Sequence, residues 1–456
     1  MQTGEKAVVT ITGIAAGGDG VGRIHGAVVF VPGTCRGDVA EIQIEYVKSG
    51  CFYGRVLRFL EASKHHRSDF CDACGTCGGC NFAHMDYEEQ RIVKRQIVAD
   101  AIERIGGFHD IEVAETLAAP RPERYRNKMV FPLGTDQQGR PVGGFYAPGS
   151  HDLIPLADCR QGDTAASAWL SEAVSFLREH HVSVYHEATR KGLARRLFVR
   201  LAEATHQAMV VLTINGDSLP HQEELINRLL AVKTDYRLTS VMLNIHKEAN
   251  NLLLGSKNKL LYGKDYIEDI LGGFSFRISA HSFYQVNSPQ TERLYQTAID
   301  LASLSGGETV LDLYCGIGTI SLFAAKYAGR VIGVEVVPQA IENAKENAER
   351  NGVRNVEFLL GKAEDIAPEL KKEKPSVVFL DPPRKGADKK ALEALVTMAP
   401  EKIVYISCNP ATLARDLKFL CGEGYSLEKI IPVDMFPNTS HVECCVLLCR
   451  NEHASI

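Results

Sequence analysis

The sequence lacks the features of a membrane or secreted protein. No stretch approaches the roughly 18 uninterrupted apolar residues of a membrane span, and the start, MQTGEK, has no apolar signal region. Internal repeats and low-complexity tracts are also missing, while 45% hydrophobic and 23% charged residues are typical of a globular protein. For a chain of 456 residues we therefore expect about two to four domains, a cytoplasmic monomer and no contact with a membrane.

An even set of cysteines is missing as well. The chain has 13 cysteines, and several fall in apolar, strand-like segments, where a reduced thiol packs as a small hydrophobic group. The cysteines in such segments are Cys315, Cys444, Cys445 and Cys449. This usage argues against a disulfide framework.

The chain also has no excess of positive charge. The net charge of −5 and the pI near 6.3 argue mildly against a nucleic-acid-binding protein. Basic residues nevertheless gather in two short segments. They are Arg121, Arg124, Arg126 and Lys128 in the first, and Arg190, Lys191, Arg195, Arg196 and Arg200 in the second. Most such runs are solvated surface, but the interleaved Tyr125 favours contact with RNA phosphates.

The first 61 residues predict a small β-barrel of the OB type. Short apolar strands alternate with glycine turns, and no helical period intervenes. We expect the strands at 7–11, 27–31, 39–46 and 52–59. Barrels of this type often bind nucleic acid, and a purely structural barrel is the alternative.

The pattern changes twice further along the chain. A cysteine-rich turn at 71–80 and a helix at 87–105 precede alternating strands and helices up to about 275. Strands in that region are expected at 194–201, 208–214 and 252–254. From 281 onward, a helix at 288–304 is followed by repeated strand and helix units. Their strands are expected at 309–314, 331–335, 356–360, 377–381, 402–407, 427–433 and 442–448.

The fold class is therefore α/β, with three domains. A barrel at 1–61 is followed by an α+β middle domain at 62–280, whose helix at 87–105 could pack on the third domain. Residues 281–456 predict a doubly wound, mostly parallel sheet. In such sheets ligands bind at the carboxyl ends of the strands.

One pair of strand ends suits a nucleotide-like cofactor. Asp312, Gly316 and Gly318 shape the turn after the strand at 309–314, and Glu335 ends the next strand. A carboxylate at that place can bind both ribose hydroxyls, which suits S-adenosylmethionine. The alternative is a tight turn without a ligand.

Cys408 and Glu443 suit methylation of a carbon that is not nucleophilic by itself. A thiolate that adds to C6 of uracil makes C5 able to attack a methyl sulfonium, and a base must then remove the C5 proton. The turn SCNP at 407–410 lifts the thiol out of the sheet, and the helix expected at 412–421 would lower its pKa. Burial would raise the pKa of Glu443 toward the range useful for a base. An inert cysteine and an edge carboxylate are the alternatives.

Four segments together resemble one known family. They are DLYCGIGT at 312–319, DPPRKG at 381–386, SCNPATLARD at 407–416 and DMFPNTSHVE at 434–443. In this order the chain resembles the TRAM-domain RNA (uracil-5-)-methyltransferases over nearly its whole length. The resemblance implies S-adenosylmethionine as methyl donor, RNA as partner, Cys408 as nucleophile and Glu443 as base. It also implies that Gln285, Tyr314 and Asp381 belong to the donor site.

The segment that begins with Asp381 also resembles a motif of another class of methyltransferases. Amine methyltransferases have a similar Asp-Pro-Pro motif followed by an aromatic residue, whereas Arg384 follows here. The difference weakens adenine-N6 methylation and favours carbon chemistry, in which Asp381 holds the donor or the pyrimidine by hydrogen bonds. A strand stop made by two prolines is the alternative.

The cysteine-rich turn has a regular spacing of three residues. Four thiolates so close in sequence do not easily surround one tetrahedral site, so a distant cysteine is expected to complete the set. The resemblance implies a [4Fe-4S] cluster. Its ligands would be Cys71, Cys77, Cys80 and Cys159, with Cys74 additional. Zinc is the alternative, although it would favour two separated cysteine pairs, and the C-x3-C-x2-C pattern of radical-donor enzymes is absent.

The resemblance also limits the substrates. In this family they are uridines of large-subunit (23S) ribosomal RNA or of the transfer RNA T-loop, and a cluster-bearing member more often resembles the ribosomal type. The uracil must be flipped or presented in a loop, because a stacked base cannot offer C6 to a thiol. A cytosine-5-methyltransferase and a non-catalytic RNA-binding factor are the rival hypotheses.

Overall fold

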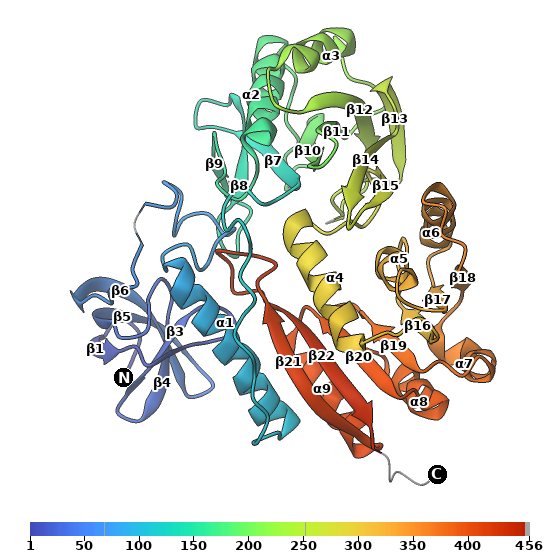
Figure 1. The fold of residues 1–456 in the computed structure, drawn as a ribbon. Helices are drawn as coiled ribbons and strands as arrows, with labels where there is room; N and C mark the ends of the chain where they lie inside the picture. The colour runs from blue at the N-terminus through green and yellow to red at the C-terminus, as the bar shows by residue number, and fades with distance from the viewer. Residues whose placement is uncertain (68, 251, 452–456) are drawn as a thin grey trace.

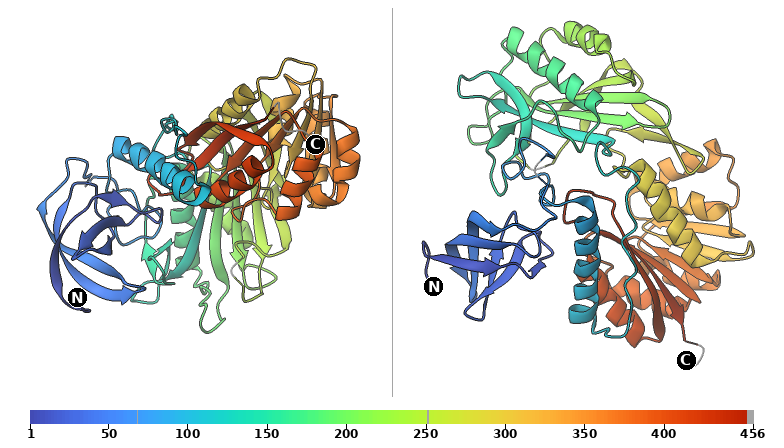
Figure 2. Two further views of the ribbon diagram at one scale, coloured as in Figure 1. Left: turned by 90° about the horizontal axis from the view of Figure 1, so that it is seen from below. Right: turned by 60° about the vertical axis from the view of Figure 1, so that its left-hand side comes forward.

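The computed structural model describes residues 1–67, 69–250 and 252–451. An N-terminal barrel, a middle sheet with two helices and a C-terminal sheet with helices on both faces lie beside one another (Figures 1 and 2). Among the described residues no helix is long and apolar enough to cross a bilayer.

The barrel contains the four expected strands and two more. They are β1 (Lys6–Thr10), β2 (Gly13–Ile14), β3 (Gly20–Ile24), β4 (Ala27–Val31), β5 (Val39–Lys48) and β6 (Cys51–Glu61), in the order β1-β5-β6-β4-β3-β2. Strand β3 was not expected because its glycines resemble turn residues. A Cβ atom on Gly22 would lie 2.3 Å from Val9 and 2.7 Å from the Thr10 carbonyl oxygen. Glycine in this strand therefore permits the close approach of β1.

The middle sheet has the strand order β13-β12-β11-β10-β7-β8-β9. Its elements are β7 (Lys128–Thr135), β8 (Pro141–Tyr146), β9 (Leu153–Pro155), α2 (Thr164–Glu179), β10 (Ala194–Ala202), β11 (Gln207–Ile214), α3 (Gln222–Ala231), β12 (Arg237–Ile245) and β13 (Lys257–Gly263). Only β11 and β12 run parallel to each other among the paired strands. The hairpin β14 (Tyr266–Leu271) and β15 (Phe274–Ser279) then leads to the C-terminal sheet.

The strand expected at 252–254 was wrong. The described residues of this segment form bends, and the side chains of Leu252 and Leu253 are 62% and 49% exposed. A short apolar triplet does not pair unless a neighbouring strand presents a free edge to it. The edge of β12 is instead paired with β13, which begins at Lys257.

The C-terminal sheet has the order β18-β17-β16-β19-β20-β22-β21. Its strands are β16 (Thr309–Leu313), β17 (Arg330–Glu335), β18 (Val356–Leu360), β19 (Val377–Leu380), β20 (Lys402–Ser407), β21 (Tyr425–Val433) and β22 (Glu443–Arg450). The first five in this order are parallel, and β22 is antiparallel to both of its neighbours. The expected doubly wound, mostly parallel sheet is therefore confirmed.

Helices cover both faces of this sheet. On one face pack α4 (Ser288–Ala302), α5 (Thr319–Ala325) and α6 (Pro338–Arg350). On the other pack α7 (Ala363–Lys372), α8 (Lys389–Met398) and α9 (Pro410–Gly422). Because both faces are covered, the central strands are buried apolar runs and offer ligands only their ends.

Helix α1 (Tyr87–Ala101), with the single π-helical turn Ile102–Gly106, packs on the C-terminal sheet although it precedes the middle sheet in the chain. Val98 lies in the same apolar core as Leu413 and Leu417 of α9. The segment that follows this helix runs along β21. Hydrogen bonds join the two, such as the one from Leu117 N to the Pro432 carbonyl. Residues distant in sequence thus lie beside the C-terminal sheet.

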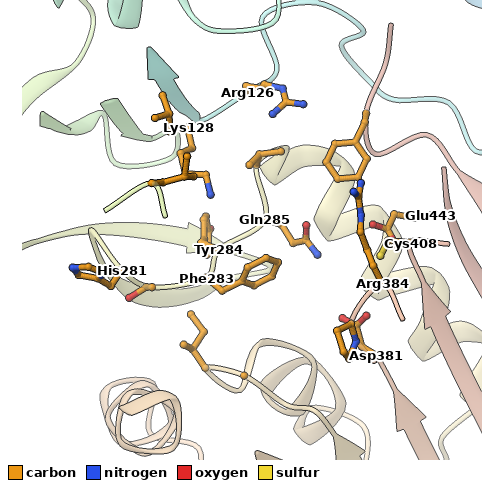
Figure 3. Close-up of a pocket in the computed structure, with 18 of the residues that line it drawn as sticks. Arg126, Lys128, His281, Phe283, Tyr284, Gln285, Asp381, Arg384, Cys408 and Glu443 are labelled. Atoms are coloured by element: carbon orange, nitrogen blue, oxygen red, sulfur yellow. The ribbon is translucent and has the colours of Figure 1, made fainter. Parts of the chain in front are cut away.

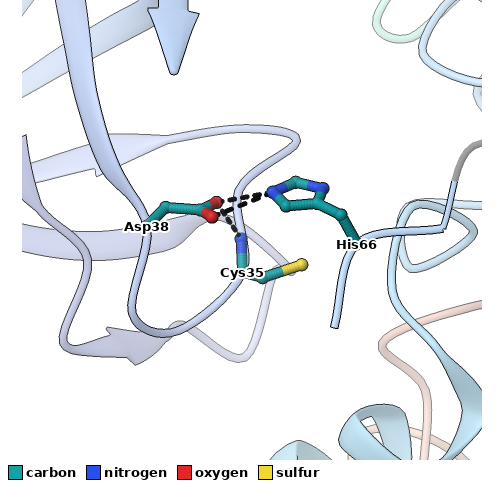
Figure 4. A group of neighbouring side chains, drawn as sticks. All are labelled: Cys35, Asp38 and His66. Atoms are coloured by element: carbon teal, nitrogen blue, oxygen red, sulfur yellow. Dashed lines mark hydrogen bonds and ion pairs between the residues drawn. The ribbon is translucent and has the colours of Figure 1, made fainter. Parts of the chain in front are cut away.

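Asp38 fastens the barrel to the segment that leads into the cysteine turn (Figure 4). Its carboxylate accepts hydrogen bonds from the backbone N–H groups of Cys35 and Ser63, both at 2.7 Å. The His66 Nε2 atom lies 2.8 and 3.0 Å from the two carboxylate oxygens. Both oxygens of the buried carboxylate are satisfied by these partners, so the group acts as a joint between the two parts of the chain.

Candidate active site

Cys408 and Glu443 face each other across neighbouring strands. Ser407 of β20 is paired with Cys444 of β22 in antiparallel register, so the next residues at that edge are Cys408 and Glu443. The Cys408 thiol is half-buried, and the Glu443 side chain is only 4% exposed. Figure 3 shows the two groups side by side, with Asp381 near them.

The parallel registers bring three further strand ends to the same edge. Leu313 of β16 is paired with Val334 of β17 and with Leu380 of β19. The residues that follow, Tyr314 and Asp381, therefore begin the loops that border Cys408. Tyr314, Asp381 and Cys408 are far apart in the sequence, and the pairing of the strands brings them to one edge of the sheet.

A single cavity of about 1340 Å³ contains these groups. The expected site residues that line it are Gln285, Tyr314, Gly316, Glu335, Asp381, Cys408 and Glu443, together with Cys71, Cys77, Cys80 and Cys159. Gln285 points toward Cys408 and Glu443 from the opposite wall (Figure 3). The cysteine turn and the candidate reaction centre thus border the same space.

Asp312 and Gly318 lie beneath the turn and do not line the cavity. The Asp312 carboxylate is fully buried and accepts a hydrogen bond from Ser321 Oγ at 2.5 Å, while burial raises its pKa to about 7. Gly318 caps α5 with φ +82°, and a Cβ atom there would lie 2.8 Å from the Phe358 ring. Both residues therefore shape the turn, and their expected contact with a donor stays a prediction.

Glu335 is held where an adenosine ribose would be recognised. Its Oε1 atom accepts hydrogen bonds from the backbone N–H groups of Val336 and Val337 at 2.8 and 3.0 Å. Its Oε2 atom accepts one from the Gly316 N–H at 3.2 Å. The carboxylate is therefore oriented at the end of β17, beside a glycine turn, where the end of a strand can offer it to a ligand.

The pKa of the Cys408 thiol is raised in this structure. Burial raises its pKa to about 11, and the carboxylates of Glu443 and Asp381 act in the same direction. The expected lowering of this pKa is therefore not seen, because burial and the two nearby acids outweigh the opposing charge of Arg384.

Glu443 and Asp381 have raised pKa values, as expected for Glu443. Burial raises the pKa of Glu443 to about 8, the nearby Asp381 adds to the increase, and Arg384 opposes it. Burial also raises the pKa of Asp381 to about 7. Carboxyl groups that titrate near neutrality are suited to proton transfer.

The loop that carries Cys408 is fastened to the loop after β19. Asn409 caps α9 through a hydrogen bond from Ala411 N to its side-chain oxygen at 3.1 Å. The Asn409 Nδ2 atom donates to the Arg384 carbonyl at 3.1 Å. The Asn-Pro turn thus determines both the start of the helix and the place of the thiol.

Several cavity residues were not expected in the donor or catalytic site, although Arg126 and Lys128 were expected to contact RNA. The structure adds Arg126, Lys128, His281, Phe283 and Arg384 to the lining (Figure 3). Phe283 is 70% exposed and gives the cavity a flat apolar surface. Its only signal in the sequence was its position two residues before Gln285.

The structure places the basic side chains of the two segments in different environments. Arg126 and Lys128 line the cavity, and burial lowers the pKa of Lys128 to about 8. In the second segment the expected phosphate contact was wrong for Arg195, Arg196 and Arg200, which are 3%, 8% and 2% exposed. Their guanidinium groups donate to backbone carbonyl groups within the middle domain or at its border. These arginines lie on a buried strand, and at least one nitrogen of each guanidinium group donates to a backbone carbonyl, although Arg195 Nε and Nη2 have no hydrogen-bond partner among the described residues.

The five cysteines of the predicted cluster region lie together. Cys80 accepts a hydrogen bond from Gln161 Nε2 at 2.7 Å, and Cys77 accepts one from the Gly79 N–H at 3.4 Å. Burial raises the Cys80 pKa to about 12, and the neighbouring Cys159 adds to the increase. Cys74 is exposed, whereas Cys159 is partly buried.

The strand order, the glycine turn of β16 and the acidic residue that ends β17 define a class I S-adenosylmethionine-dependent methyltransferase. Residues 2–57 match the model of the TRAM domain, and residues 231–451 match that of tRNA (Uracil-5-)-methyltransferases. The chain belongs to the TRAM-domain RNA (uracil-5-)-methyltransferase family.

Relatives extend along the whole chain. An RNA methyltransferase of Clostridium tetani is 45% identical, over 96% of this chain and 95% of that protein. One from Caldanaerobacter subterraneus is 43% identical over 99% of both. The crystal structure of Pyrococcus abyssi tRNA (uracil-54, C5)-methyltransferase in complex with S-adenosyl-L-homocysteine is similar, with a TM-score of 0.77 and 26% identity over 96% of this chain and 99% of that one.

Proposed function

We propose that this RNA methyltransferase modifies C5 of a specific uridine through a covalent bond between Cys408 and C6 of the base. The observation that carries the proposal is the juxtaposition of Cys408 and Glu443 at the ends of β20 and β22, in the cavity that Gln285 and Glu335 also line. Carbon methylation needs a nucleophile and a base on one ring, and these two side chains have those chemistries.

The reaction begins when the thiolate of Cys408 attacks C6. The new S–C6 bond moves the C5=C6 electron pair toward the O4 oxygen, which makes C5 nucleophilic. C5 then bonds to the methyl carbon, whose former bond electrons remain with the donor sulfur. Glu443 takes the proton from C5, C5=C6 forms again, and the S–C6 bond breaks to release the thiolate.

S-Adenosylmethionine supplies the electrophilic methyl group. For the donor site we propose Glu335 at the ribose hydroxyls, Gly316 and Tyr314 along the turn, and Gln285 on the opposite wall. Asp381 lies between this end of the cavity and Cys408, so it can hold the donor or the pyrimidine by hydrogen bonds. Asp312 and Gly318 support the turn from below.

The proposed substrate is large-subunit ribosomal RNA. The support is the cysteine set at one end of the cavity, since cluster-bearing members more often resemble the ribosomal type. Transfer RNA is the second candidate, favoured by the similarity to the tRNA (uracil-54, C5)-methyltransferase of Pyrococcus abyssi. A cytosine-5 reaction has no comparable support.

Mapping of 5-methyluridine in a deletion strain separates these substrates. We expect large-subunit ribosomal RNA from that strain to lose 5-methyluridine at one or more positions and transfer RNA to keep its own. Nucleoside analysis by mass spectrometry measures both pools after they are separated. Loss from transfer RNA alone would favour the second candidate, and loss of 5-methylcytidine would refute the uracil reaction.

We also propose that Cys71, Cys77, Cys80 and Cys159 hold a [4Fe-4S] cluster with a mainly structural role. The support is that these thiols line the same cavity and that two of them accept N–H hydrogen bonds, as sulfur ligands of clusters do. The methylation chemistry requires no electron transfer. Three of the cysteines come from the turn at 71–80, and Cys159 comes from the middle domain. The cluster would therefore connect the turn to the middle domain.

Iron analysis tests the cluster. Protein purified without oxygen should be brown and contain about four irons per chain. Cys159→Ser should lose the iron and loosen the middle domain, whereas Cys74→Ser should retain it because Cys74 is exposed. Cys51→Ser, at a half-buried cysteine of the barrel, is the matched control. Stoichiometric zinc without visible absorption would contradict the proposal, and iron loss in Cys74→Ser would show a different ligand set.

A further inference from the structure

The loop between β21 and β22, residues 434–442, leads directly into Glu443, and we refer to it as the base loop. Most of its side chains are buried, and Asn438 adopts the left-handed conformation with φ +65°. Irregular backbone does not hold its own shape by a regular hydrogen-bond ladder, so partners elsewhere must determine it. The position of Glu443 therefore depends on where these partners hold the base loop.

Helix α1 supplies the deeper partners. The Gln90 side chain is fully buried, and its Oε1 atom accepts a hydrogen bond from Asn438 N at 2.8 Å. Its Nε2 atom donates to Asn438 Oδ1 at 3.2 Å and to the carbonyl oxygens of Phe82 and Met85 at 3.2 and 3.0 Å. One amide therefore joins α1, the end of the cysteine turn and the base loop.

A buried ion pair anchors the start of the base loop. The Lys94 Nζ atom lies 2.5 Å from Asp434 Oδ1 and donates to the Phe436 carbonyl at 3.0 Å. Neither charged side chain of the pair is exposed to solvent. Loss of either partner would leave a buried charge, so this pair serves the fold as much as the site.

The cysteine turn supplies a second amide clamp. Asn81 Oδ1 accepts a hydrogen bond from Ser440 N at 2.8 Å, and Asn81 Nδ2 donates to Ser440 Oγ at 2.9 Å. The same Nδ2 atom donates to the Gly17 carbonyl of the barrel at 2.7 Å. Asn81 directly follows Cys80, and Ser440 precedes Glu443 by three residues.

We propose that Gln90 and Asn81 are positioning residues, which hold the base loop so that Glu443 reaches the C5 proton. Each amide offers an acceptor and donors in one plane and uses both on the loop. The inference rests on the proposed role of Glu443. It also couples the cysteine turn to the reaction, because Asn81 lies beside Cys80 and contacts the base loop directly.

The position of the base loop should affect only one step of the reaction, the removal of the C5 proton. Addition of Cys408 to C6 and methyl transfer do not use Glu443, whereas removal of the C5 proton does. A displaced base loop should therefore slow only the last step, and the methylated covalent adduct should accumulate. A general loss of structure would instead reduce every step and leave no adduct.

Asn81→Ala tests this directly, because Asn81 is exposed and its replacement should leave the protein folded. The variant is incubated with unmodified RNA from a deletion strain and a methyl-labelled donor, and the adduct is followed on a denaturing gel. We expect kcat to fall by roughly tenfold to a hundredfold, as for small displacements of a catalytic group, with little change in KM for RNA. Gln90→Met should have the larger effect if it folds, and iron content should stay at the wild-type value in Asn81→Ala.

Two further variants are the controls. Asn81→Asp keeps the acceptor for Ser440 N and should recover part of the rate. Thr76→Ala removes a hydrogen bond within the cysteine turn, from Thr76 Oγ1 to the Ala73 carbonyl, and should turn over without adduct. Normal kcat in Asn81→Ala, or a lower kcat without adduct, would overturn the positioning role. If Glu443→Gln forms no adduct, the proposed base is wrong; if it does and Asn81→Ala does not, only the positioning role fails.

Discussion

Cys408→Ala should abolish methylation and leave the affinities for RNA and donor close to those of the wild type. No other thiol lies at the ends of β20 and β22 on the cavity side among the described residues, so nothing else there can form the bond to C6. Loss of a nucleophile commonly reduces the rate by three or more orders of magnitude, about 1.36 kcal/mol of barrier per factor of ten. Methyl incorporation into RNA from the deletion strain measures the rate.

Cys421→Ala is the matched control for this substitution. Cys421 lies on α9, in the same domain, and burial raises its pKa to about 11 as it does for Cys408. Its replacement removes a half-buried thiol of similar character away from the cavity and should leave turnover within about twofold of wild type, as for a neutral substitution. Substantial turnover by Cys408→Ala would exclude the covalent route.

Glu443→Gln should trap the methylated RNA on the protein. The substitution keeps the size of the side chain but removes the group that accepts the C5 proton, so the enzyme should add to C6, transfer the methyl group and then stop. A slow band on a denaturing gel, labelled from the methyl donor, measures the adduct. We expect a turnover loss of roughly two to four orders of magnitude, the usual contribution of a general base.

The fold of Glu443→Gln can be checked through its pH dependence. The pKa of Glu443 is raised to about 8 in the folded protein from the ordinary 4.5, so the folded state binds the proton more tightly than the unfolded state. This carboxyl therefore reduces wild-type stability as pH rises from about 4.5 to about 8. The glutamine variant lacks that loss, and its melting temperature should rise relative to wild type across the same interval. Normal turnover in this folded variant would place the base elsewhere.

The α/β order of the C-terminal part could be predicted because each strand is short, apolar and bounded by turn residues. The expected strands at 356–360 and 402–407 agree with β18 and β20 residue for residue. Such agreement is expected for β20, which is buried on both faces, whereas β18 is a partly exposed edge strand whose bounds follow from its short apolar pattern. The barrel strand β3 was missed for the opposite reason, because glycine signals a turn unless the approach of another strand is known.

Charge was the least reliable guide. Arg195, Arg196 and Arg200 have the composition of an RNA-binding face, yet all three are buried and donate to backbone carbonyl groups. The pKa of Cys408 was misjudged in the same way, since the helix is a local feature and the nearby carboxylates are not. Electrostatic environments depend on burial and on distant neighbours, which no local pattern specifies.

The sequence by itself determined most strands of the C-terminal sheet, the glycine turn, the family and the residues with the chemistry of a nucleophile and a base. These are encoded locally, by hydrophobic period, turn residues and short motifs. Only the tertiary structure decided that Cys408 faces Glu443, because that depends on the antiparallel register of β22 against β20. It also decided that Gln90 and Asn81 hold the base loop, because hydrogen bonds between segments about 350 residues apart arise from packing and leave no periodic trace in either segment.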